Sequence, residues 1–274
     1  MHPLRLAPAA VLLALANPAP GEQPAAAKTA QAEGSNSSKI CFADSVLCAK
    51  TPARALDAAR VRRGRAVYGR YCVSCHGEVG DGRGYSAPFL DPQPRDFTRG
   101  IFKCRSTPSG SLPTDADLLR TLRGGLYHSN MPPWEVLGDR QLRDVAEYLK
   151  TFSPRWVEEG PGEPIEVPRE PADDAGSRRR GEKVWKEQGC FNCHGNTGKG
   201  DGPAVSSLFD DWGRRSVPFD FTVNSHRKCG TTSRELYVTF MTGLNGTPMP
   251  SNAETITPED AWHLVHYLQT LQRR

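Results

Sequence analysis

Apolar residues recur at helical spacing in several short segments of the chain, and no segment shows the strict alternation that predicts a half-buried strand. The clearest cases are 142–149 and 264–271, where leucine and valine return every three or four residues. Three further helices are expected over 61–71, 115–126 and 179–189. The pattern therefore predicts a mostly helical fold.

Residues typical of helix ends mark two of these segments. Thr114 stands at the position of an N-cap, and Gly124 lies near the end of the helix that follows. Before the last helix, Thr257-Pro258-Glu259-Asp260 combines a capping hydroxyl, a proline at the first helical position and early acidic residues. We therefore expect helices to begin directly after Thr114 and Thr257.

An internal repeat is the main organisational feature of the chain. Each copy contains a Cys-x-x-Cys-His pentapeptide, an Asp-Phe-Thr segment, a Gly-Leu loop that ends in Met-Pro, and an apolar segment with a tyrosine. His76 and Met131 are 55 residues apart, and so are His194 and Met249, although the intervening loops differ in length. Because the insertions cancel, we infer that the histidine and the methionine of each repeat contact one and the same bound group. The paired segments are 71–84 with 189–204, 95–104 with 219–229, 125–134 with 243–252, and 144–152 with 263–271.

The regions outside the repeat have different compositions. Residues 1–16 combine a positive start with an apolar run that is too short to span a bilayer, which is typical of a cleaved signal peptide; an uncleaved membrane anchor is the alternative. The composition of 17–60 is that of a flexible tether, and the Pro- and Glu-rich residues 153–177 form a linker that we expect to be extended. The two repeats then form one domain over 61–152 and a second over 178–274.

The charge distribution excludes one class of partner. The chain carries 35 Lys and Arg against 31 Asp and Glu, a formal net charge of +4. The sequence contains no basic stripe with interleaved aromatic residues, so we expect no nucleic-acid partner. Both repeats are mildly basic and the linker is acidic, which gives a weak preference for acidic partner surfaces.

Two pentapeptides carry the chemistry: Cys72-Val73-Ser74-Cys75-His76 and Cys190-Phe191-Asn192-Cys193-His194. Both match the c-type haem attachment pattern. Thiols about one helical turn apart add to the two vinyl groups of the porphyrin, and the following imidazole becomes a ligand of the iron. A zinc half-site, a redox dithiol and a chance disulfide are the alternatives. Pentapeptides 118 residues apart are a poor four-ligand zinc set, and a redox dithiol needs a βαβ context.

Methionine supplies the sixth iron ligand in this interpretation. Met131 and Met249 both precede proline, and each lies at the same distance from the histidine of its repeat. A thioether favours ferrous iron, so His/Met ligation raises the reduction potential. Met241 falls within a helical segment and is assigned to packing. The expected iron ligands are therefore His76 with Met131 and His194 with Met249.

Each repeat resembles a class I cytochrome c domain, from an N-terminal helix with Gly64 or Gly181 to a C-terminal helix with Tyr148 or Tyr267. The resemblance covers the two repeats and leaves out the tether and the linker. It implies an all-α fold of two tandem class I cytochrome c domains, each a few helices wrapped around one covalently bound haem. It also implies that the glycine lets the first and last helices of each domain cross closely against the tyrosine.

Four cysteines remain outside the pentapeptides. Cys41 and Cys48 are close in sequence and are the favoured local disulfide in an exported protein. Cys104 and Cys229 occupy corresponding positions in the repeat, and three roles are open for them. They could bridge the domains, stay free in the core, or ligate iron, as a cysteine does in some diheme thiosulfate dehydrogenases that resemble this architecture. His128, three residues before Met131, is a rival ligand for the first iron.

Three further histidines, His226, His263 and His266, lie outside any motif that would make them iron ligands. The last two are expected on a helix surface.

Taken together, the sequence predicts a periplasmic diheme cytochrome c that transfers single electrons between redox proteins of a respiratory chain through two covalently bound haem c groups. Membrane association would arise only through a partner or an uncleaved signal. Because a protein ligand fills the sixth position of both irons, we expect a carrier and not a substrate-converting enzyme. The alternatives are a diheme oxidoreductase, peroxidase-like or thiosulfate dehydrogenase-like, with one catalytic haem, and a redox sensor.

Overall fold

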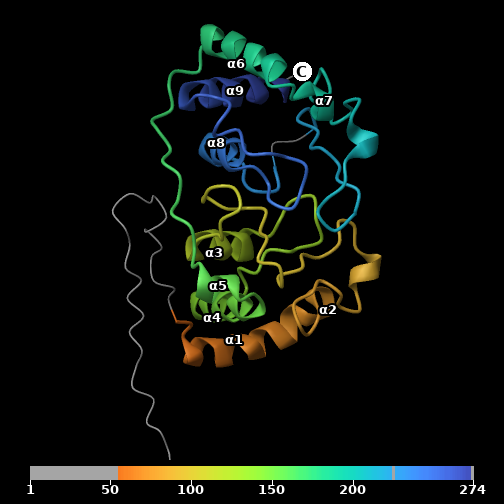
Figure 1. Ribbon diagram of the computed structural model, residues 1–274, viewed down its shortest axis with the longest axis vertical. Helices are drawn as coiled ribbons and strands as arrows, with labels where there is room; N and C mark the ends of the chain where they lie inside the picture. Colours follow the sequence, from red (N-terminus) through yellow and green to blue (C-terminus); the bar gives the residue numbers. More distant parts are fainter. Residues whose placement is uncertain (1–54, 224–225, 273–274) are drawn as a thin grey trace, which may run out of the picture. The chain divides into compact units, whose positions relative to one another are not determined.

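The computed structural model describes residues 55–223 and 226–272. The expected signal peptide over 1–16, almost all of the expected tether over 17–60, and Cys41 and Cys48 lie outside the described residues. Within the described ranges the chain is helical and contains isolated β-bridges but no strand, which confirms the all-α prediction (Figure 1). The helices are α1 Ala58–Tyr71, α2 Val73–His76, η1 Ala87–Phe89, α3 Asp115–Gly124, α4 Asp139–Leu149, η2 Lys150–Phe152, α5 Arg155–Glu158, α6 Ala175–Glu187, α7 Phe191–His194, η3 Val205–Ser207, α8 Ser233–Thr242 and α9 Pro258–Leu271.

Capping side chains determine where the helices begin. The expected caps are confirmed: Thr114 accepts a hydrogen bond from the Asp117 N–H at the start of α3, and Thr257 accepts one from Asp260 at the start of α9. Two helices begin earlier than the apolar pattern predicts. Asp57 caps α1 at Ala58, and Asp174 caps α6 at Ala175, because carboxylates accept hydrogen bonds from the first free backbone N–H groups.

The first and last helices of each repeat cross at a glycine (Figure 1). A Cβ atom at Gly64 would overlap the backbone carbonyl of Asp144 in α4 and approach the Cβ of Tyr148 to 2.8 Å. At Gly181 it would overlap the carbonyl of His263 in α9. The contact implied by the family resemblance is therefore confirmed in both domains.

Each domain has its own apolar core. The first gathers around α4 and includes Leu142 and Val145, and the second gathers around α9 and includes Val265 and Leu268. Met241 is buried in the second core, as expected for a packing residue.

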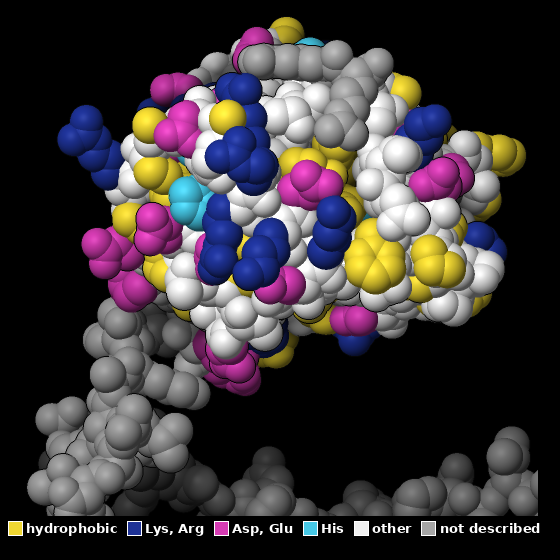
Figure 2. Space-filling view, turned by 90° about the horizontal axis from the view of Figure 1, so that it is seen from above, with side chains coloured by type: hydrophobic (Ala, Val, Ile, Leu, Met, Phe, Trp, Pro, Cys, Tyr) yellow, Lys and Arg dark blue, Asp and Glu magenta, His cyan; other side chains and the backbone are white. Residues whose placement is uncertain are grey.

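The molecular surface on the α6 side carries Lys and Arg side chains interspersed with Asp and Glu (Figure 2). Ion pairs at such exposed positions contribute little to stability.

Two expectations about the linker and the last helix are wrong. Residues 155–158 of the linker form the helix α5 instead of extended chain, because Trp156 is only 3% exposed and packs into the first core. His266 is fully buried and not on a helix surface. Its Nδ1 lies 2.6 Å from Ser177 Oγ and its Nε2 lies 3.1 Å from Glu170 Oε1, so the linker is held against α9 by a buried polar group with both nitrogens hydrogen-bonded.

The two domains are joined by a disulfide and by reciprocal insertions. Cys104 and Cys229 are bonded to each other, which selects the bridging arrangement among the three that the sequence left open. In the first domain, ten residues (105–114) separate the bridging cysteine from α3, against three (230–232) before α8 in the second. The buried Arg105 in this longer segment donates hydrogen bonds to the Thr242 and Gly243 carbonyls of the second domain.

The compensating insertion of the second domain contacts the first. Between equivalent glycine and phenylalanine positions, Gly202 and Phe221 are separated by 18 residues, whereas Gly84 and Phe97 are separated by 12. Trp212 from this longer segment donates its Nε1–H to Asp96, and the Arg95 guanidinium stacks 4.3 Å above its ring. Each insertion therefore packs against the other domain.

Candidate haem sites

The first pentapeptide lines an open, largely apolar cavity between α1, α3 and α4. Cys72, Cys75 and His76 enter it from the end of α1 and from the short helix α2, and Met131 enters it from the loop after α3. Leucine, phenylalanine, tryptophan, tyrosine and proline side chains supply most of the remaining wall. The structure thus brings the four residues predicted for the first site into one cavity.

The backbone around both pentapeptides follows the same course. Each short helix ends at a glycine with positive φ, 78° at Gly77 and 75° at Gly195. The chain then returns, so that the carbonyl oxygen of His76 accepts a hydrogen bond of 2.9 Å from Gly82, and that of His194 accepts one of 2.9 Å from Gly200. The glycine-rich segments after the pentapeptides therefore hold the histidine backbone in place.

Hydrogen bonding orients both imidazole rings. The Nδ1 of His76 lies 3.0 Å from the carbonyl oxygen of Arg95, and the Nδ1 of His194 lies 3.1 Å from that of Phe219. A carbonyl oxygen only accepts, so Nδ1 carries the proton and Nε2 is left with the lone pair that binds a metal. Burial lowers the pKa of both rings, which favours this neutral form.

The two methionine loops are also alike. Met131 accepts a hydrogen bond of 3.0 Å at its carbonyl oxygen from Leu126, and Met249 accepts one of 3.1 Å from Leu244. Their backbone N–H groups donate to the hydroxyls of Ser129 and Thr247 at 3.3 and 3.2 Å. Both methionines are half-buried: Met131 packs against the first core, and Met249 packs against the second together with Cys190.

The environment of the thiols does not suit a thiolate. Burial raises the pKa of Cys72 to about 12 and that of Cys190 to about 11, so neither thiol is activated as a redox dithiol requires. Within residues 55–223 and 226–272, no three His, Cys, Asp or Glu side chains come together as ligands for a metal ion. The zinc alternative therefore finds no four-ligand set in the described part of the chain.

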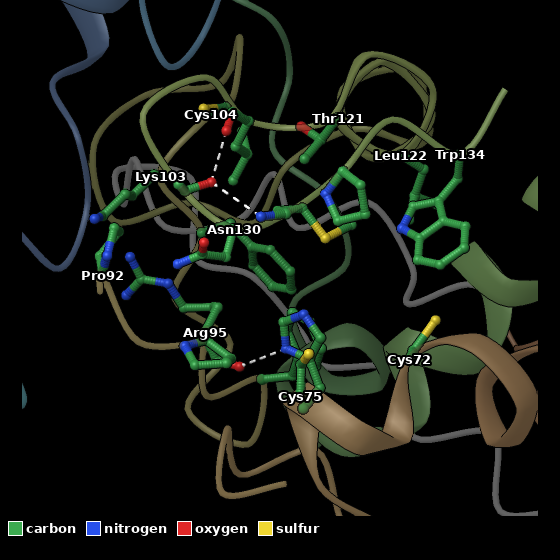
Figure 3. Close-up of a pocket in the computed structure, with 18 of the residues that line it drawn as sticks. Cys72, Cys75, Pro92, Arg95, Lys103, Cys104, Thr121, Leu122, Asn130 and Trp134 are labelled. Carbon is green, nitrogen blue, oxygen red and sulfur yellow. Dashed lines mark hydrogen bonds between the residues drawn. The ribbon is translucent and has the colours of Figure 1, made fainter. Parts of the chain in front are cut away.

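The residues lining the first cavity fit a c-type haem. In Figure 3, Arg95, Lys103 and Asn130 lie on the side of the cavity opposite Cys72 and Trp134. The Nη1 of Arg95 is buried and has no hydrogen-bond partner. The Cys72 thiol at one edge, an imidazole and a thioether in the wall, and a cation at the opposite edge match a porphyrin with vinyl groups on one side and carboxylates on the other.

His128 takes no part in this cavity wall. Its Nε2 lies 2.8 Å from the carbonyl oxygen of His226 in the second domain, and its ring packs edge-on against Phe219 at 5.2 Å. Cys104 and Cys229 are likewise unable to act as thiolate ligands while they are bonded to each other. The rival ligands that the sequence left open are therefore engaged elsewhere in this structure.

Sequence reasoning missed the polar edge of the first cavity. Arg95, Lys103, Asn130 and Lys228 all line it, and Lys228 belongs to the second domain. The only available signal was that Lys103 and Lys228 each precede a bridging cysteine, which says nothing about the cavity that the side chain reaches.

Comparison with known proteins agrees with the geometry. Residues 179–272 match the family model described as cytochrome c, and residues 59–149 match the model described as cytochrome c oxidase, cbb3-type, subunit III. A solved chain of the reducing HAO-like protein complex of Kuenenia stuttgartiensis is 41% identical, with a TM-score of 0.74 over 76% of this chain and 95% of that chain. No curated protein matches. The chain belongs to the cytochrome c family: it is a diheme cytochrome c with two cytochrome c domains, which imply covalently bound haem c.

Proposed function

We propose that this protein transfers single electrons between redox proteins of a respiratory chain, through two haem c groups ligated by His76 with Met131 and by His194 with Met249. Bound haem supplies the one-electron chemistry of its iron. The chain itself supplies the thioether links, the ligand orientation and an apolar wall that excludes water. In this proposal the segment 1–16 directs export to the periplasm.

The observation that carries the proposal is the meeting of His76 and Met131 in the wall of one cavity, with Cys72 and Cys75 beside them. When the protein supplies both axial ligands, no coordination position remains for a substrate. The second domain supports the same assignment, because its His194 and Met249 have the same backbone hydrogen bonds as their counterparts.

The partner in this proposal is a larger redox enzyme. The similar solved chain comes from a reducing HAO-like protein complex, and the first domain matches a family described as an oxidase subunit. Both descriptions concern assemblies of redox proteins, so we infer that this chain works as an electron-transferring component of such an assembly. None of the described helices combines the length and the hydropathy that a membrane span requires.

Absorption and EPR spectra of the ferric holoprotein test the proposal. We expect two low-spin His/Met signals; Met131→Ala should remove one of them, and Met249→Ala should remove the other. Met241→Leu is the matched control, because Met241 is buried in the second core and should leave both signals unchanged. A high-spin or His/thiolate signal in the unsubstituted protein would contradict the proposal and favour an oxidoreductase with one catalytic haem.

A further inference from the structure

The polar edge of the first cavity is built from both domains. Arg95 and Lys103 come from the first domain and Lys228 comes from the second, and all three line the same cavity. Each lysine directly precedes a cysteine of the Cys104–Cys229 disulfide, so this covalent bridge holds the two lysine backbones next to each other. The convergence of three cations is therefore a property of the assembled pair of domains.

These three cations lack anions. Among the residues that the structure describes, no carboxylate lies within ion-pair distance of Arg95, Lys103 or Lys228. Four carboxylates, Asp91, Asp96, Asp210 and Asp211, act on the cluster only at longer range. Burial, together with repulsion from Lys228 and Arg95, lowers the pKa of Lys103 to about 7, and burial lowers the pKa of Lys228 as well. Desolvated cations of this kind are stabilised by bound carboxylates.

The opposite edge of the cavity indicates which carboxylates these are. Cys72, which forms a thioether in the proposed function, lies across the cavity from Arg95 and Lys103 (Figure 3). The haem propionates lie on the porphyrin edge away from the vinyl groups. The Arg95 side chain lies on that side, and its buried Nη1 has no hydrogen-bond partner.

We propose that Arg95, Lys103 and Lys228 form a carboxylate site shared by the two domains, which binds the propionates of the first haem and makes this haem the higher-potential one. The proposal rests on the proposed function only in that haem c occupies the first cavity. Positive charge beside a haem stabilises the ferrous form, which carries one positive charge fewer than the ferric form.

The second domain does not repeat this edge. The positions equivalent to Gln93, Arg95 and Asn130 in the repeat are occupied by Val217, Phe219 and Pro248. Lys228, the equivalent of Lys103, lines the cavity of the other domain. Arg227 directly precedes Lys228 in the sequence. It is buried, and its guanidinium carbon lies 5.9 Å from the centre of the Phe221 ring in the second core. Lys228 therefore adds a cation to the first cavity, whereas the second core holds Arg227 at the position that Phe102 occupies in the first domain.

A redox titration of the full-length holoprotein tests the shared site, with each haem followed through its own EPR signal as assigned by the Met131 and Met249 variants. The first haem should have the higher potential. Lys228→Gln should shift its reduction equilibrium about tenfold towards the ferric form, about 59 mV, and leave the second haem unchanged. Lys103→Gln should lower the same potential, and Lys228→Arg should restore it.

Lys183→Gln is the matched control, because it removes the same charge from an exposed side chain on α6 of the second domain. It should leave both potentials unchanged. If Lys228→Gln shifts neither haem, or shifts both equally, the shared carboxylate site is wrong even when both EPR signals remain low-spin His/Met. Loss of those signals in the unsubstituted protein would instead overturn the proposed function, so the two failures are distinguishable.

Discussion

The two cytochrome c domains are alike where they hold the iron ligands and different where they meet each other. Both have a glycine at the crossing of their first and last helices, and both hold the Nδ1 of the ligand histidine at a backbone carbonyl. The polar cavity edge belongs to the first domain, and the long insertion lies at different places in the two copies. Repetition preserves the ligands, while the differences create the interface and the cationic edge of the first cavity.

The reciprocal insertions show how this interface is made. Arg105 of the first domain donates to carbonyl groups next to the methionine loop of the second, and Trp212 of the second packs beside the segment whose carbonyl holds His76. Each insertion thus contacts a segment that positions an axial ligand in the other domain. Substitutions made in one domain at a time test whether the domains behave as equals.

Removing the thiols of one pentapeptide should have the largest effect. Cys72→Ser/Cys75→Ser and Cys190→Ser/Cys193→Ser should each reduce the intact mass of the denatured protein by one haem, because thioether bonds survive denaturation and non-covalent binding does not. The altered domain should also lose helix content, since its cavity would lack the group that fills it. A variant that keeps two haem additions would show that the pentapeptide is not the attachment site.

Removing the bridge between the domains should have the next largest effect. The Cys104–Cys229 disulfide closes a sequence separation of 125 residues. A crosslink over a loop of that size restricts the unfolded chain and so raises the free energy of unfolding by about 4–5 kcal/mol. Cys104→Ser/Cys229→Ser should retain both haems but unfold at lower denaturant concentration, with the two domains separating into two transitions. A single transition at an unchanged midpoint would mean that the insertions alone join the domains.

Substituting the crossing glycines should have a smaller and matched effect. Gly64→Ala and Gly181→Ala each place a methyl group against a backbone carbonyl of the partner helix, which should cost about 1–3 kcal/mol in denaturant unfolding. Gly69→Ala, in the same helix as Gly64, is the control: nothing lies within 4 Å of its added Cβ, so stability should rise by about 0.5–1 kcal/mol. Equal losses at both crossings would show that the two domains are equally sensitive at this contact, and no loss at either would refute the close crossing.

Much of this site is predictable from the sequence because its parts are local or repeated. The pentapeptides place two thiols and an imidazole within one helical turn, and a repeated methionine at constant separation selects the partner ligand. The N-caps at Thr114 and Thr257 depend on residues three positions away, so the sequence places them well. The burial of His266 cannot be predicted from local spacing, because it depends on Glu170 and Ser177, which are distant in sequence.

The sequence by itself determined the all-α class, the two repeated domains, and the thiols and histidines that suit haem attachment, since each follows from short-range spacing. The tertiary structure decided that Cys104 pairs with Cys229, that the insertions pack on the opposite domain, and that Lys228 lines the first cavity. These facts depend on how two similar domains pack together, and a repeat specifies the form of each copy without specifying which surfaces of the copies come into contact.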